Sequence, residues 1–311
     1  MVLTSTTLSS STGILSGTIG TTTGTQASPN LVRTLMTLAD LTNSSGLYVS
    51  SSSTNFVGNI FTVAGGNWSD TSIWSTRTVP TANDNVTINA NHYVTLDANG
   101  ATRDLTLNGF GGLIVNANTL TVNNLLTTAS ASVININGGT VNVLATIAGT
   151  ANGYSSSGNL NLLSGTLNIS QPLVNNRTFT SAGTTNIAGG NLNVNGNINY
   201  SAGTWQQSGG TITVNGNNGS AAGSVASATN IVQFTGITHI VTGGTMIIVN
   251  PHFGPTGLAF NYNASTSTNW TNHTLQFGDG VSTIMSGAVA TVGTTVANLG
   301  FGVSTTTATA T

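Results

Sequence analysis

The chain has 311 residues, a formal net charge of -2 and only 3% charged residues, and it contains no lysine, glutamate or cysteine. Without clusters of Lys and Arg there is no long-range field to attract nucleic acid or anionic lipid, so we predict no nucleic-acid partner. The lack of cysteine excludes disulfides and thiolate-bound metals, and no apolar run is long enough to cross a membrane as a helix.

Residues 1–60 are rich in Ser and Thr, and we expect them to form a β-rich segment of their own that supplies an inter-subunit strand. Strands are expected at residues 17–20 and 47–49, where apolar positions are bounded by turn residues. The alternative is a helix that begins at Ser28 and Pro29, since Ser caps helices well and Pro is favoured at the first helical position.

Residues 64–88 differ in character from the rest of the chain, because they concentrate tryptophan and charge before the strand-like run Val86-Thr87-Ile88. The residues that stand out are Trp68, Asp70, Trp74, Arg77, Pro80 and Asp84. This spacing resembles the opening segment of β-helical domains in secreted adhesin-like surface proteins of Bacteroidota, over roughly residues 60 to 115. The resemblance implies a cap that closes one end of a solenoid, as atypical terminal units do, and the alternative is a ligand site formed by the tryptophans.

A short phrase, Gly138-Gly139-Thr140-Val141-Asn142-Val143, recurs along the chain. Altered copies begin at Ser164, Gly189 and Gly209, and weaker ones at Gly111 and Gly243, so the intervals in chain order are 27, 26, 25, 20 and 34 residues. Glycines at the same point of each repeat indicate a tight corner or a positive φ angle. We assign the excess length of the last interval to a loop at residues 215–224.

Branched apolar residues alternate with polar ones in short bursts from Val86 onward, which is typical of short strands with one buried face. The predicted inward pairs are Val86/Ile88, Val94/Leu96, Leu105/Leu107, Leu113/Val115, Leu120/Val122, Ile134/Ile136, Val141/Val143, Leu167/Ile169, Leu192/Val194 and Ile212/Val214. Three bursts fit one interval; those starting at 86, 94 and 105 are expected to form one coil, with the next coil beginning at 113. We therefore predict an all-β fold in which residues 61–290 form a parallel β-helix of roughly eight or nine coils.

Residues 291–311 are predicted to hold one C-terminal strand and a tail, because residues 296–303 alternate strictly between apolar and small or polar positions. A strand of this kind either completes the β-helix or pairs with another subunit. Leu299, Phe301 and Val303 are the expected contacts within a polymer.

Few residues are suited to catalysis, and we predict no enzyme, no metal and no cofactor. Glycoside hydrolysis generally uses two carboxylates at a fixed separation, and the best candidates here are Asp97 and Asp104 beside Arg103, which we interpret as a solvated turn with a local ion pair. The histidines His92, His239, His252 and His273 lack the spacing of metal ligands.

We expect an extracellular structural protein, a subunit of a self-assembling surface fibre or adhesin joined by end-to-end stacking or strand addition, because low charge and high β propensity favour ordered self-association. The alternative is a carbohydrate- or ice-binding solenoid that uses one repetitive face of Thr121, Asn142, Asn168, Asn193 and Thr213, with Asn at three of these positions weighing against ice. A polysaccharide lyase or hydrolase is a third hypothesis, which the missing lysine and carboxylate pair disfavour.

Overall fold

The structure is a computed structural model that describes residues 58–144, 152–169, 178–214, 231–235, 238–249, 259–263, 266–267 and 272–278, together with the backbone of several further strands. The chain divides into two compact units, Met1–Val57 and Gly58–Thr311, which we call unit 1 and unit 2. Within the described ranges, no helix has the length and apolar character that a membrane crossing requires.

Unit 1 contains two antiparallel strand pairs, β1 (Thr7–Ser10) with β2 (Gly13–Ser16) and β3 (Thr21–Thr25) with β4 (Ser28–Val32). The expected β-rich character is therefore confirmed for these strands. Ser28 and Pro29 open a strand and not a helix, which a two-stranded sheet tolerates because both strands are edges. The strands predicted at residues 17–20 and 47–49 lie outside the described residues.

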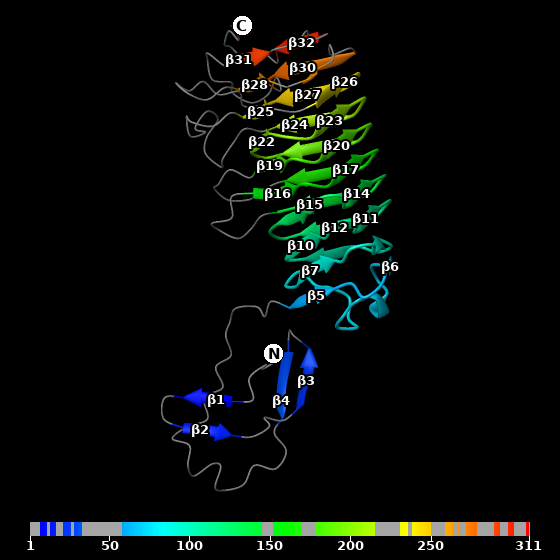
Figure 1. The fold of residues 1–311 in the computed structure, drawn as a ribbon, viewed down its shortest axis with the longest axis vertical. Helices are drawn as coiled ribbons and strands as arrows, with labels where there is room; N and C mark the ends of the chain where they lie inside the picture. Colours follow the sequence, from blue (N-terminus) through cyan, green and yellow to red (C-terminus); the bar gives the residue numbers. More distant parts are fainter. Residues whose placement is uncertain are drawn as a thin grey trace. The chain divides into compact units, whose positions relative to one another are not determined.

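Unit 2 is built from three parallel sheets whose strands follow one another in rotation, so that from β7 to β30 each turn of the chain adds one strand to each sheet (Figure 1). Sheet 1 contains, in order, β5 (Asn59–Phe61), β7 (Asn85–Ile88), β10 (Asp104–Leu107), β13 (Leu126–Thr128), β16 (Asn152–Ser156), β19 (Thr178–Ser181), β22 (Asn197–Tyr200), β25 (Val232–Thr235), β28 (Phe260–Asn263), β31 (Val289–Val292) and β33 (Thr309–Ala310). Sheet 2 contains β6 (Gly66–Asn67), β8 (Tyr93–Thr95), β11 (Gly112–Val115), β14 (Val133–Ile136), β17 (Asn159–Leu162), β20 (Thr184–Ile187), β23 (Thr204–Gln207), β26 (Thr238–Val241) and β29 (Thr266–Ser267).

Sheet 3 contains β9 (Gly100–Thr102), β12 (Thr119–Val122), β15 (Thr140–Val143), β18 (Thr166–Ile169), β21 (Asn191–Val194), β24 (Thr211–Val214), β27 (Gly244–Ile248), β30 (His273–Phe277) and β32 (Asn298–Phe301). A short 3-10 helix, η1 (Thr71–Ile73), lies before the first full coil. Three parallel sheets stacked coil on coil are the architecture of a parallel β-helix, so the predicted fold class is confirmed.

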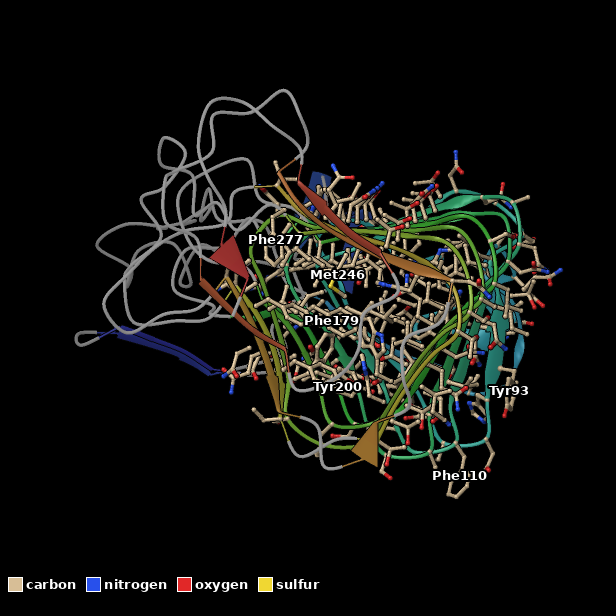
Figure 2. The ribbon with its side chains drawn as sticks, turned by 90° about the horizontal axis from the view of Figure 1, so that it is seen from above. Tyr93, Phe110, Phe179, Tyr200, Met246 and Phe277 are labelled. Atoms are coloured by element: carbon tan, nitrogen blue, oxygen red, sulfur yellow. The ribbon has the colours of Figure 1, made fainter. Side chains whose placement is uncertain are left out.

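The core of unit 2 runs between the three sheets. Every predicted inward pair is buried, from Val86 and Ile88 to Ile212 and Val214. Figure 2 shows Phe179, Tyr200, Met246 and Phe277 pointing into the interior, whereas Tyr93 and Phe110 point away from it. The period-two alternation therefore identified the buried face of the strands correctly, because neighbouring side chains of a strand point to opposite faces.

The predicted phase of the coils was wrong at the first turn. Leu105 pairs with Val86 of β7 on one side and with Leu126 of β13 on the other, so β10 lies next to β7 in sheet 1 and already begins the second coil. The third strand of the first coil is β9, which carries Gly100, Ala101 and Thr102 instead of an apolar pair and therefore gave no alternation signal. The weak copy at Gly111 belongs to sheet 2, and the true equivalent of the phrase in that coil is β12, where Thr119 pairs with Thr140.

The glycines of the phrase form the corner between sheets 2 and 3, as predicted. Gly165, Gly190, Gly210 and Gly244 have φ angles between 69° and 86°, a region that favours glycine. A Cβ atom at Gly190 would lie 2.5 Å from the carbonyl oxygen of Gly165 in the coil below. The corner thus requires glycine both for its backbone conformation and for the close stacking of successive coils. The loop predicted at residues 215–224 lies outside the described residues.

Candidate functional site

The predicted cap residues gather at the N-terminal end of unit 2. Trp68 and Trp74 are fully buried, and their rings meet edge to face with centroids 5.1 Å apart. The indole Nε1 of Trp74 donates a hydrogen bond to the carbonyl oxygen of Trp68 at 2.9 Å. Pro80 and Asp84 are also buried, whereas Asp70 and Arg77 are exposed, with Arg77 in a left-handed conformation at φ 54°.

Backbone hydrogen bonds from the same segment occupy the outer edge of β5. Ser75 N donates to Phe61 O at 2.9 Å, and Val63 N donates to Ile73 O at 2.7 Å. The Asp70 carboxylate begins η1 by accepting from Ser72 N at 2.8 Å, and hydrogen bonds from Ser72 lower the pKa of Asp70. The strand edge at Phe61 and just beyond β5 is thus bonded within unit 2 and is not open to another chain there.

The two aspartates considered for catalysis hold different parts of the backbone. Asp97 accepts hydrogen bonds from the side chain and the backbone N–H of Ser69, which lower the pKa of Asp97. Asp104 Oδ1 accepts from Asn124 Nδ2 at 2.6 Å and from Leu125 N at 3.1 Å in the next coil. Arg103 Nε lies 3.8 Å from Asp104 Oδ2, which is the local ion pair predicted from the sequence.

Three of the four histidines lie in the described residues, and each contacts a neutral polar group. His92 Nδ1 lies 2.8 Å from Thr62 Oγ1, His239 Nδ1 lies 2.8 Å from the Tyr262 hydroxyl, and His273 Nε2 lies 3.1 Å from Gln207 Oε1. Burial lowers the pKa of His239 to about 3 and that of His273 to about 4. Among the described residues, no group of three or more His, Asp or Glu side chains is placed to hold a metal ion.

The five residues of the predicted repetitive surface lie in one column on the outer face of sheet 3. Thr121 pairs with Asn142, Asn142 with Asn168, Asn168 with Asn193, and Asn193 with Thr213. The amides in the centre are bonded to one another: Asn168 Nδ2 donates to Asn142 Oδ1, and Asn193 Nδ2 donates to Asn168 Oδ1, each at 2.8 Å. We call this row the amide column.

A second outward column runs beside it on the same sheet, and sequence reasoning missed it. The residue two positions before each member of the amide column also points outward, because side chains in a strand alternate between faces. Together with the next two residues in register, in β27 and β30, they form a row of seven of which six are threonine: Thr119, Thr140, Thr166, Asn191, Thr211, Thr245 and Thr274. The sequence signal that could have identified this row is the Thr that follows the two glycines in the recurring phrase, such as Thr140. We call this row the threonine column.

The other two outer faces are less uniform. Sheet 2 has an amide row in which Asn161 Nδ2 donates to Asn135 Oδ1 at 2.8 Å, but this face also carries Tyr93, Ile114 and Val133. On sheet 1 a column of Thr87, Thr106 and Thr127 runs beside the charged Asp104. From β12 to β24, the outer face of sheet 3 presents only Thr and Asn in both columns.

The predicted polymer contacts fall at the other end of unit 2. Leu299 and Phe301 belong to β32, which pairs with β30, and Val303 lies outside the described residues. Residues 291–311 therefore supply strands to the same β-helix, since β31 and β33 pair in sheet 1.

No protein-family model, curated protein or solved structure matches this chain.

Proposed function

We propose that this chain is an extracellular structural protein, a β-helical rod within a surface fibre or adhesin, that links to copies of itself by strand addition. The observation that carries the proposal is the difference between the two ends of unit 2. At the N-terminal end, residues 73–75 are bonded to the outer edge of β5. The difference lies in sheet 1, where β33 at the other end pairs only with β31; in the other two sheets the terminal described strands, β6 and β29 in sheet 2 and β9 and β32 in sheet 3, each pair on one side.

This asymmetry favours strand addition over symmetric stacking of two ends. An unpaired strand edge is a template for a strand from another chain, whereas an edge already bonded is not. The four strands described in unit 1 are short and form two-stranded sheets, and an isolated two-stranded sheet is marginally stable. A strand from unit 1 of one copy is therefore a suitable donor for the edge of β32 or β33 in the next copy.

The regular parts of unit 2 support a structural role and not a catalytic one. The carboxylates of Asp97 and Asp104 hold separate backbone segments, and the outward amides bond to one another between coils. Such ladders join successive coils and stiffen the rod. An extracellular setting fits the resemblance of residues 60 to 115 to secreted adhesin-like proteins.

The absence of cysteine allows a direct test with single introduced thiols. We would mix the full-length variants Thr23→Cys, in β3, and Asn298→Cys, in β32, under mild oxidation. Strand addition brings the two positions of neighbouring copies close enough for a mixed disulfide, which requires Cα atoms within about 7 Å. We expect a cross-linked species on denaturing gels and filaments by electron microscopy.

Phe61→Cys is the matched control, since Phe61 lies at the bonded N-terminal end and its side chain is exposed. Mixed with Thr23→Cys, this variant should give no cross-link above the level of random collision. If the wild-type chain forms only single particles, and Asn298→Cys cross-links no more than Phe61→Cys does, self-assembly by strand addition is wrong.

A further inference from the structure

The outer face of sheet 3 is a two-dimensional array. Along the rod, neighbouring strands of a sheet lie about 4.8 Å apart, and along each strand the two columns are separated by two residues, or about 6.6 Å. The paired positions are Thr119/Thr121, Thr140/Asn142, Thr166/Asn168, Asn191/Asn193 and Thr211/Thr213. The register is continuous across these five strands, so hydroxyls and amides repeat with fixed spacings in both directions.

The array is held rigidly before any ligand binds. Each strand is hydrogen-bonded to its neighbours, and the amides of Asn142, Asn168 and Asn193 fix one another. Threonine has few accessible χ1 rotamers because its β carbon is branched. A surface whose groups are already ordered loses little conformational entropy on binding, which favours a ligand that is itself an ordered repeat.

The chemistry of the array selects among repetitive ligands. From β12 to β24 the two columns contain no charged and no aromatic residue. A polyanion has no cationic partner there, and a polysaccharide finds no aromatic ring against which the apolar face of a sugar could pack. Threonine offers a methyl group beside a hydroxyl, and asparagine offers both donors and acceptors, so the face suits a neutral lattice of water molecules.

We propose that the outer face of sheet 3, from β12 to β24, binds the surface of crystalline ice. The inference goes beyond the structural role proposed above and does not depend on it, since it uses a side of the β-helix and not its ends. The asparagines are compatible with this role because the amide column lies beside a column that is mainly threonine. A rod with this face would attach to ice along its length.

The test measures thermal hysteresis and the inhibition of ice recrystallisation with the full-length protein. Thr166→Tyr places a bulky ring at the centre of the array, and we expect about a tenfold loss of activity, because disrupting the centre of a closely packed interface costs most of its binding. Thr127→Tyr makes the same change on the outer face of sheet 1 and should keep the wild-type activity. Circular dichroism checks that both variants keep the wild-type melting temperature within a few degrees, on the scale set by a surface substitution.

Two results would overturn the proposal. The first is that the wild-type protein neither changes the shape of ice crystals nor slows their recrystallisation. Binding of this inactive protein to insoluble cellulose or chitin would then indicate a polysaccharide ligand. The second is an equal loss of activity in Thr166→Tyr and Thr127→Tyr. If Thr166→Tyr fails to fold, Thr140→Lys on the same face replaces it with the same expected loss. Failure of self-assembly in the cross-linking experiment leaves these measurements unaffected.

Discussion

The coils from β7 to β15 and those from β16 to β30 share one backbone repeat but differ in their cores. In the first region every buried hydrophobic side chain is Val, Leu or Ile. In the second region the core also contains large aromatic rings, with Trp205 and Phe234 having centroids 4.9 Å apart. The first buried ring of the second region, Tyr154, lies next to a register shift between β16 and β19. Tyr200, Trp205 and Phe234 lie in strands that pair without such a shift, so the difference teaches that the same strand register can enclose either an aliphatic or an aromatic core.

The aromatic region also brings polar groups into the interior. The Tyr200 hydroxyl lies 2.7 Å from the carbonyl oxygen of Gly183, and His239 and His273 are fully buried beside Tyr262 and Gln207. Buried polar groups are stable only when hydrogen-bonded, so each of these residues needs its partner. The second region therefore holds titratable histidines in its core, which makes it more sensitive to pH than the first.

The largest expected effect comes from the centre of the aromatic region. Trp205→Ala should lower the free energy of unfolding by about 3–5 kcal/mol, because the lost ring packs against Phe179, Tyr200 and Phe234 and leaves a cavity. Leu120→Ala is the matched change in the aliphatic region and should cost about 2–5 kcal/mol. Urea denaturation measures both. A smaller loss for Trp205→Ala than for Leu120→Ala would show that the rings are loosely packed.

Acid should destabilise the aromatic region selectively. The unfolded chain binds protons at its histidines below pH 6.5, whereas the folded His239 and His273 do so only near pH 3 and pH 4. The two histidines therefore leave the free energy of unfolding unchanged above pH 6.5. As the pH drops from 6.5 toward 4 and 3, they lower this free energy by up to about 1.4 kcal/mol per pH unit for each histidine.

Hydrogen exchange at pH 7 and pH 5 measures this effect, with the amides of β12 and β15 as an internal reference. We expect faster exchange at pH 5, after correction for the intrinsic rates, in β26 and β30 but not in the reference strands. In His239→Gln combined with His273→Gln, this pH dependence should be greatly reduced. Equal acid sensitivity in both regions would contradict the assignment to the buried histidines.

The smallest expected effect concerns the amide column, which crosses the boundary between the two regions. Asn168→Ala removes one hydrogen bond to Asn142 and one from Asn193, so it should cost about 1–2 kcal/mol. Thr121→Ala, at the start of the same column, should change the stability by no more than about 0.5 kcal/mol. Thermal unfolding of the two variants provides the comparison, and equal values would mean that the ladder adds no stability.

The aliphatic region was largely predictable from the sequence, because branched apolar residues at every second position identify the buried face of a strand. The aromatic region was not: Tyr154 and Phe179 each lie ten residues before their copy of the phrase, but Trp205 lies four residues before its copy and belongs to a different sheet. The first coil was assigned the wrong phase because β9 has no apolar pair. The amide column followed from the phrase, but the threonine column required the register of the strands, and the bonds that close the edge of β5 join residues that no local pattern connects.

The bonded edge of β5 also predicts the order of folding, from the N-terminal end of unit 2 toward its C-terminal end. The first strands of unit 2 are completed by residues that follow them closely in the chain, so we expect this end to form early, since short loops close at low entropic cost. Each later coil then finds a finished strand edge on which to pair, and no coil has to wait for a distant segment. During synthesis, which starts at the N-terminus, the β-helix can thus form one coil at a time. A long unpaired sheet is then never exposed to other molecules.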